Sequence, residues 1–213
     1  MSDILNGLNP QQKEAVMHTE GPLLILAGAG SGKTRVLTHR IAYLIENGFA
    51  EPEDILALTF TNKAAKEMKE RAASLTGKAA DKMLITTFHS ACVRFLKNRM
   101  MLLGYKRGNF VIYDTDEQKK IIRTIFEETG FQGRYPDIRV YDVISFISKQ
   151  KEKMLGPDEL ESIYPDYPLI TVYKEYERIL KKNNALDFDD LLWKTVQLFE
   201  NYPHILHSYQ EQF

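Results

Sequence analysis

Apolar and polar positions follow two different periods along the first half of the chain. Three short apolar runs, closed by glycine or polar residues, are typical of strands buried on both faces: residues 23–27, 55–60 and 83–87. Each is followed by a segment with helical spacing: residues 33–47, 62–75 and 88–103. A further helix is expected from Pro10, with Asn9 as its N-cap. Three strand–helix units predict a parallel sheet with right-handed crossovers.

This alternation stops at Gly104, and a mostly helical stretch follows it. Only residues 110–113 look strand-like between 108 and about 184, and the rest reads as helices interrupted by glycine and proline. Another helix is expected at Asp187, with acidic residues in its first turn. The pattern predicts an α/β fold with a helical insertion, divided at residues 1–107, 108–182 and 183–213.

Composition adds limits to this picture. The chain has 213 residues, of which 44% are hydrophobic and 27% charged, as in ordinary globular proteins. The single Cys92 excludes an internal disulfide framework. No apolar run reaches the roughly 18 residues of a membrane span, and the N-terminus lacks the basic and apolar regions of a signal peptide. We therefore expect a cytoplasmic protein without a membrane partner.

The formal net charge of −1 hides an uneven distribution. Residues 59–107 contain eleven Lys and Arg against three acids, whereas residues 155–213 contain five basic residues against eleven acids. A basic middle segment beside an acidic one suits a polyanion partner at one face, although scattered surface charge gives similar counts. Charge alone does not decide the function.

A glycine-rich loop joins the first predicted strand to the next helix. Its residues are Ala27, Gly28, Ala29, Gly30, Ser31, Gly32, Lys33 and Thr34. In the pattern G-x-x-x-x-G-K-[ST], backbone amides and a helix N-terminus cradle phosphates, the lysine reaches the outer phosphates and the hydroxyl ligates Mg²⁺. Ala27 replaces the first glycine, and a plain turn with an incidental lysine is the alternative. The position at a strand-to-helix junction favours ATP binding.

Two other segments follow predicted strands, where open α/β sheets bind ligands. Residues 59–65 contain Phe60, Asn62 and Lys63, and residues 87–90 contain His89. Considered singly, Asn62 reads as a helix cap, Phe60 as core, Lys63 as solvated and His89 as a satisfied polar group. An exposed aromatic side chain can instead stack on any base.

Taken together, these segments resemble the UvrD/PcrA/Rep helicases. The shared features occur in the same order: Gln12 in LNPQQKEAV, the loop AGAGSGKTR, LTFTNKAA, TFHS and LDFDDL. The resemblance is strong over residues 8–100 and 185–199 and weak over 108–182. It implies a RecA-like domain 1A interrupted by a helical insertion called 1B, ATP and Mg²⁺ as ligands, and 3′ to 5′ movement on DNA.

The resemblance also implies roles for individual residues. Gln12 is the expected adenine-reading glutamine, with Gln11 as the competitor, and Arg35 would lie near the base and sugar. Single-stranded DNA, and its junctions with duplex, would contact residues at the strand ends and the return from the insertion: Phe60, Thr61, Asn62, Lys63, His89 and Phe188. Asp189 and Asp190 are expected to be first-turn caps rather than metal ligands, which leaves the metal to Thr34.

Hydrolysis needs more than a phosphate cradle: a carboxylate on Mg²⁺, a second one for water, and arginines. Family members carry an Asp-Glu strand directly after a segment resembling residues 209–213, and a second domain follows. We therefore expect an N-terminal fragment with an incomplete, partly exposed sheet and little ATPase or unwinding activity.

Other functions remain open from the sequence. The chain could be a regulatory or assembly module that binds nucleotide and DNA without translocation, or a P-loop kinase, although residues 108–182 show no acceptor site. Repair and replication proteins are possible partners, and the sequence does not choose between them. Residues 148–153 carry lysines at alternate positions, which favours a solvated helix over a patch that binds duplex DNA.

Overall fold

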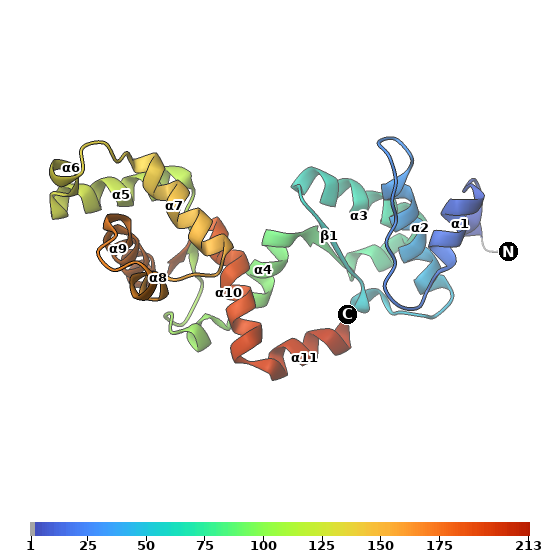
Figure 1. Ribbon diagram of the computed structural model, residues 1–213. Coiled ribbons are helices and arrows are strands. Elements are labelled where there is room, and N and C mark those ends of the chain that lie inside the picture. The colour runs from blue at the N-terminus through green and yellow to red at the C-terminus, as the bar shows by residue number, and fades with distance from the viewer. Residues whose placement is uncertain (1–2) are drawn as a thin grey trace. The chain divides into compact units, whose positions relative to one another are not determined.

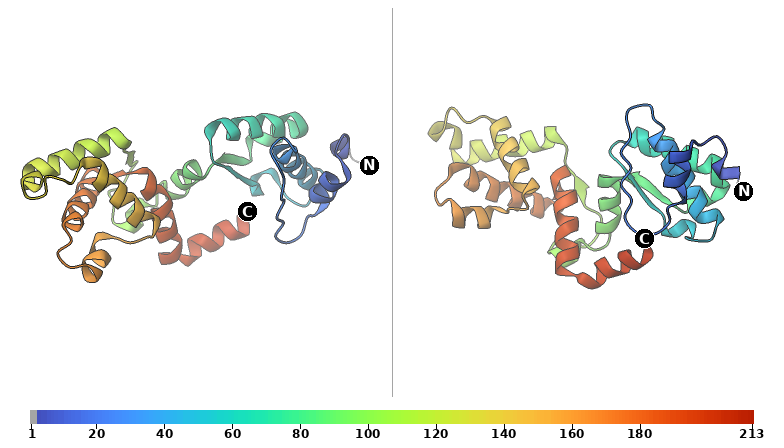
Figure 2. Two further views of the ribbon diagram at one scale, coloured as in Figure 1. Left: turned by 45° about the horizontal axis from the view of Figure 1, so that its top comes forward. Right: turned by 45° about the vertical axis from the view of Figure 1, so that its right-hand side comes forward.

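The computed structural model describes residues 3–213, which form two compact units (Figures 1 and 2). Unit 1 contains the chain up to Ala91 together with His207–Phe213, and unit 2 contains Cys92–Leu206. The boundaries expected for 1A and 1B, at residues 107 and 182, remain a prediction. Among the described residues, no helix combines the length and apolar character needed to cross a membrane.

Unit 1 is built on two parallel strands. β1 (Leu56–Thr59) pairs with β2 (Leu84–Thr87), from Leu56 opposite Leu84 to Thr59 opposite Thr87. The helices are α1 (Pro10–Met17), α2 (Lys33–Glu46) and α3 (Asn62–Thr76), with short 3-10 turns η1 (Asp3–Leu5), η2 (Pro52–Asp54) and η3 (Gly77–Asp81). Ile41, Ile55, Met68 and Met83 form the core beneath this sheet. The predicted helix starts at Pro10 and near Asn62 are confirmed.

The first predicted strand is wrong. Residues 22–28 form no strand, and the side chains of Leu24 and Leu26 are 81% and 86% exposed. A strand requires a neighbour that accepts and donates its backbone hydrogen bonds, and within residues 3–213 β1 pairs only with β2. The apolar residues of this run are suited to burial, but no described strand pairs with them. Within the described residues the sheet of unit 1 has two strands.

The helix predicted over residues 88–103 is also divided. α4 (Phe88–Leu96) ends before Asn98, whose φ of +64° is left-handed, and the 3-10 turn η4 (Met100–Leu103) follows. A left-handed residue cannot continue an α-helix. Apolar spacing alone did not reveal this break.

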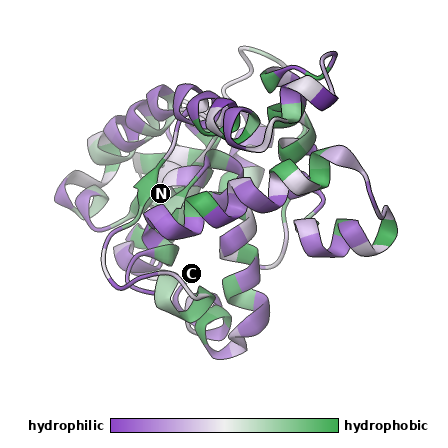
Figure 3. Ribbon diagram, turned by 90° about the vertical axis from the view of Figure 1, so that its left-hand side faces the viewer, coloured by the Kyte–Doolittle hydropathy of each residue, from purple (hydrophilic) through white to green (hydrophobic). Residues whose placement is uncertain are grey.

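Unit 2 is mostly helical, as predicted for residues 108–184. Its helices are α5 (Thr115–Thr129), α6 (Phe131–Arg134), α7 (Val140–Glu152), α8 (Pro157–Ile163), α9 (Pro168–Asn183) and α10 (Phe188–Asn201); α11 (Pro203–Gln212) follows. β3 (Val111–Ile112) pairs in parallel with β4 (Ala185–Leu186), a strand that the pattern did not predict. Figure 3 shows hydrophilic and hydrophobic residues mixed along the helical ribbons, and α5, α7 and α9 bury a shared core that includes Ile122, Val143 and Tyr173.

Candidate functional site

The glycine loop of unit 1 opens α2 with uncovered backbone amides. Gly30 and Gly32 have φ of +76° and +89°, which side-chain-bearing residues rarely adopt. Gly32 is the N-cap of α2, and no side chain caps this helix or places an acid in its first turn. The first amides of a helix lack partners within the helix and carry partial positive charge. The end of α2 is thus suited to an anion such as phosphate.

A side chain at Gly32 would also disturb its surroundings. A Cβ built there would lie 3.0 Å from Gln12 Nε2. The position therefore needs glycine for two reasons: its left-handed backbone and the closeness of Gln12.

Lys33 folds back over the loop. Its Nζ donates to the carbonyl oxygens of Ala27 at 2.9 Å and Gly28 at 2.7 Å, and the side chain is exposed. The neighbouring Thr34, the second residue of α2, is half-buried. Lys33 and Thr34, the side chains predicted to hold phosphate and Mg²⁺, therefore both lie at the N-terminus of α2.

Gln12 ties α1 to this loop. Its Oε1 accepts a hydrogen bond from the Asn9 backbone at 3.0 Å, and its Nε2 donates to the Ser31 carbonyl at 3.0 Å. Asn9 in turn accepts from the Gln12 backbone at 2.8 Å, so the predicted N-cap is confirmed as one half of a capping box. The adenine-reading role of Gln12 stays a prediction, and base pairing would have to replace these bonds.

A cavity of about 290 Å³ lies against the loop, and both candidate glutamines line it. Its wall includes Gln11, Gln12, Ala27, Gly28, Ser31 and Lys33, and none of the described lining residues is a carboxylate. Arg35 lies outside this wall, and its Nη2 would be 2.8 Å from a Cβ built at Gly7. The structure therefore places Arg35 against the turn before α1.

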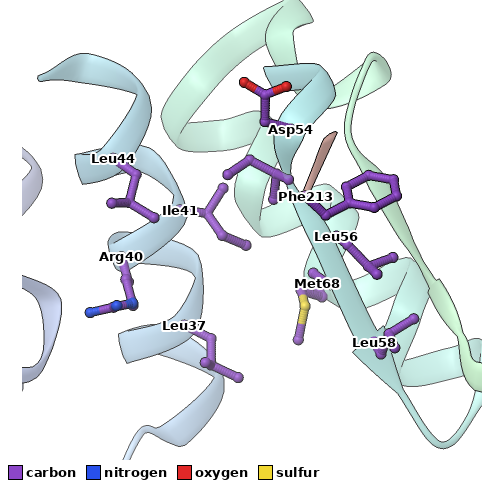
Figure 4. A pocket seen from close by; sticks show the side chains of 11 residues that line it. Leu37, Arg40, Ile41, Leu44, Asp54, Leu56, Leu58, Met68 and Phe213 are labelled. Atoms are coloured by element: carbon purple, nitrogen blue, oxygen red, sulfur yellow. The ribbon is translucent and has the colours of Figure 1, made fainter. Parts of the chain in front are cut away.

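A larger, apolar cavity of about 500 Å³ runs between α2 and the unpaired edge of β1 (Figure 4). Leu37 and Ile41 line it from α2, Leu56 and Leu58 from β1, and Phe213 also contributes. Arg40 and Asp54 also line it, but most of its wall is aliphatic or aromatic, and we do not assign chemistry to it.

The ends of β1 and β2 meet at one edge because the two strands are parallel and in register. Phe60 follows β1 and is 91% exposed, so its predicted alternative as core is wrong. Its ring lies 5.5 Å from that of Phe88, which follows β2. Together the two rings form an exposed aromatic surface at this edge.

Polar residues around these rings also organise the helix starts. Thr61, not Asn62, caps α3 by accepting a hydrogen bond from the Ala64 backbone at 3.1 Å. Asn62 is the first residue of the helix, and it and Lys63 are exposed. At the other strand end, Thr87 Oγ1 accepts from the Ser90 backbone at 3.2 Å. His89 is half-buried beside this bond.

Phe188 belongs to unit 2 and begins α10, where it is 52% exposed. Asp187 is the N-cap and accepts from the Asp190 backbone at 2.8 Å, while Asp190 accepts from the Asp187 backbone at 3.3 Å. The capping role predicted for Asp190 is confirmed. Asp189 does not cap, and burial raises the pKa of its carboxyl. Within residues 3–213, no cluster of His, Cys, Asp and Glu is suited to a metal ion.

A buried lysine, which the sequence pattern did not identify, holds this helix start. Lys151 Nζ lies 2.7 Å from Glu177, 2.8 Å from Asp187 and 2.8 Å from Asp190. Its side chain is fully buried, so the prediction of a solvated helix face is wrong at this residue. The signal was available: Val143, Ile147 and Lys151 recur every four residues and are all buried.

Burial and charge act against each other in this cluster. Burial disfavours the charge of Lys151, but the carboxylates of Asp190, Glu177 and Asp187 outweigh it and raise the pKa of Lys151. Burial likewise opposes ionisation of Asp187, yet Lys151 and several hydrogen bonds keep the pKa of Asp187 below its usual value. For Asp190 burial prevails over Lys151 and raises the pKa to about 7. The cluster is thus a buried group of paired charges at the N-terminus of α10.

Comparison with known proteins gives consistent matches. The UvrD/REP helicase N-terminal domain family matches residues 8–213. The chain is 47% identical over 215 residues to the ATP-dependent DNA helicase PcrA of Bacillus subtilis (strain 168). It is 46% identical over 216 residues to the protein of the same name from Staphylococcus aureus (strain Mu50 / ATCC 700699). Each alignment covers 100% of this chain and 29% of the relative, so the chain spans less than a third of their length.

Proposed function

The chain belongs to the UvrD/REP helicase N-terminal domain family, and from this premise we propose that it is the ATP- and single-stranded-DNA-binding portion of a DNA helicase that moves 3′ to 5′. The observation that carries the proposal is the uncapped N-terminus of α2, reached through a left-handed Gly32 and flanked by Lys33 and Thr34. The relatives named above are described as ATP-dependent DNA helicases. The direction of movement rests on the family resemblance.

The nucleotide site assigns a role to each nearby side chain. Phosphate oxygens fit the amides of the first turn of α2, and Lys33 would exchange the carbonyls of Ala27 and Gly28 for them. The Thr34 hydroxyl would be a ligand of Mg²⁺, which offsets phosphate charge when bound. Gln12 would bind the adenine edge, and Arg35 would lie beside the nucleoside.

The edge formed by β1 and β2 supports DNA binding. Phe60 and Phe88 offer exposed rings on which bases stack irrespective of sequence. Thr61, Asn62, Lys63 and His89 follow these two phenylalanines directly in the sequence and would bind the DNA backbone. Within unit 2, Phe188 is a separate candidate for stacking on a base, at a helix start where Lys151 pairs with Asp187.

We also propose that this chain alone does not turn over ATP. Among the described residues no carboxylate lines the cavity at the glycine loop, whereas phosphoryl transfer requires one for Mg²⁺ and one for water. The unpaired edge of β1 and the apolar cavity beside it suit a further strand, which would cover Leu56 and Leu58. In the relatives, the two carboxylates would then come from the part of the protein that does not align with this chain.

Two titrations with the whole chain test the proposed function. A fluorescent ATP analogue with Mg²⁺ should bind, and Lys33→Ala should abolish binding, whereas the exposed Lys78→Ala should not change it. A labelled single strand should bind less tightly to Phe60→Ala but normally to Phe49→Ala, a matched control because Phe49 is also exposed, at 55%. Equal loss in a variant and its control would contradict the assigned site.

A further inference from the structure

One stretch of unit 2, outside the contacts proposed above, contains basic residues and no acidic ones. Residues 92–113 contain five basic residues and no Asp or Glu: Arg94, Lys97, Arg99, Lys106 and Arg107. Nothing in the nucleotide site or at the β1–β2 edge uses this stretch.

The fold gathers several of them around one hollow. Asn98, Lys106 and Arg107 line a hollow of about 360 Å³ together with two methionines and Gly108. The end of α9 adjoins it, because Lys106 Nζ donates to the Lys182 carbonyl at 2.7 Å. The preceding Lys181 lies with Nζ 5.9 Å from the centre of the Tyr105 ring. We call the exposed residues Asn98, Lys106, Arg107, Lys181 and Lys182 the Lys106 surface.

Backbone contacts hold this surface in place. Asn184, left-handed at φ +53°, receives a hydrogen bond from the Lys106 amide at 2.9 Å and donates one to the Asn109 carbonyl at 3.1 Å. Immediately beyond, Val111 pairs with Ala185 in the short β3–β4 ladder. The loop that carries Lys106 and Arg107 is therefore fixed against the end of α9, and its charges are organised before any ligand arrives.

A purely structural role accounts for only part of this charge. Cations near a helix C-terminus complement its dipole, which explains the contact of Lys106 with the last turn of α9. It does not explain Arg107, which lines the hollow. Among residues 3–213, Lys106, Arg107, Lys181 and Lys182 form no ion pair, although unit 2 contains many acids. Four exposed cations lie in or beside a hollow whose described lining contains no acid, and Glu175, on the same helix as Lys182, is an acid whose pKa Lys182 helps to lower.

We propose that the Lys106 surface binds successive phosphates of a nucleic-acid backbone, as a contact separate from Phe60 and His89. Guanidinium and ammonium groups bind phosphate through charge-assisted hydrogen bonds, and Asn98 adds a neutral amide. The identity of the polyanion rests on the proposed function, which makes DNA the substrate. The contact would add affinity without sequence preference.

The test removes two exposed charges whose side chains take no part in the backbone contacts described above. The double variant Arg107→Ala/Lys182→Ala leaves the Lys106 and Asn184 hydrogen bonds in place. Its affinity for a labelled single strand should fall about tenfold, and the slope of log Kd against log salt concentration should fall by about 1.4 for two lost phosphate contacts. The charge-preserving Arg107→Lys/Lys182→Arg should restore both quantities.

The control is Lys149→Ala/Lys153→Ala, which removes two exposed, unpaired lysines of the same unit. An equal loss in this control would overturn the inference, because it would show a general charge effect. The inference would also be overturned if Arg107→Ala/Lys182→Ala left both the DNA affinity and the salt slope unchanged. Loss of binding to anionic vesicles without loss of binding to DNA would overturn it too. Failure of the proposed function looks different: the unmodified chain would bind no DNA, or Phe60→Ala would leave affinity unchanged.

Discussion

The ammonium of Lys151 lies 2.8 Å from the carboxylate of Asp187, inside a core where both side chains are fully buried. This pair joins α7 to the N-cap of α10. The helix that presents Phe188 therefore begins at a point fixed by a residue 36 positions earlier in the chain.

Removing this lysine should destabilise unit 2 strongly. Lys151→Met keeps an unbranched side chain only one atom shorter but leaves Asp187, Asp190 and Glu177 without their cation. Breaking a buried pair in this way costs about 3–5 kcal/mol. Urea unfolding followed by circular dichroism should show the loss, while Lys149→Met, exposed on the same helix, should change stability by less than about 0.5 kcal/mol. Equal midpoints for the two variants would contradict the structure.

Asp190 should make stability depend on pH near neutrality. Its pKa is about 7 in the folded chain and near the ordinary 3.8 when unfolded. Between these values the folded state binds a proton that the unfolded state lacks, so this group's contribution is full below about 3.8 and lost as the pH rises to 7. Each unit of pKa difference corresponds to about 1.4 kcal/mol.

The comparison of Asp190→Asn with the unmodified chain isolates this effect. Asparagine stays neutral and keeps an oxygen for the Asp187 amide. From pH 5 to pH 8, the unmodified chain should lose unfolding free energy relative to the variant. Parallel stability curves over this range would show that Asp190 is ionised throughout.

Gly32→Ala should weaken nucleotide binding and destabilise the start of α2. Its φ of +89° costs a side-chain-bearing residue about 1–2 kcal/mol, and the new Cβ would press on Gln12 Nε2. Gly133→Ala is the control, because Gly133 is helical and has no atom within 4 Å of the added Cβ. Thermal unfolding and analogue binding measure the two effects; a Gly32 variant as stable as the control would refute the steric account.

Asn184→Gly should loosen the loop before β3. Glycine tolerates the left-handed backbone, so the change removes only the side-chain bonds to Lys106 and Asn109. Hydrogen exchange at the Lys106 amide should accelerate, whereas exchange at Val111, bonded to the Asn184 carbonyl at 3.0 Å, should remain slow. Unchanged exchange at the Lys106 amide would mean that the Asn184 side chain does not hold the loop.

Local signals predicted a large part of this molecule. Asn9 with Pro10, Gly77 after α3 and the acids after Asp187 mark helix ends through backbone chemistry within a few residues. The glycine loop was predictable for the same reason. Its contacts with Lys33 span no more than six positions.

Long-range features were not predictable in this way. Leu24 and Leu26 resemble strand residues, but a strand needs a partner, and apolar spacing does not specify one. Lys151 shares the buried helix face of Val143 and Ile147, which hinted at its burial, but the carboxylates that keep it charged there come from residues 26 to 39 positions away. Both outcomes depend on tertiary neighbours.

The most direct test of the central claim is phosphate release by the whole chain with ATP, Mg²⁺ and single-stranded DNA, measured beside analogue binding. The account predicts saturable binding of the analogue that Lys33→Ala abolishes. It also predicts phosphate release no faster than that of Lys33→Ala, with or without DNA. DNA-stimulated release that depends on Lys33 would contradict it.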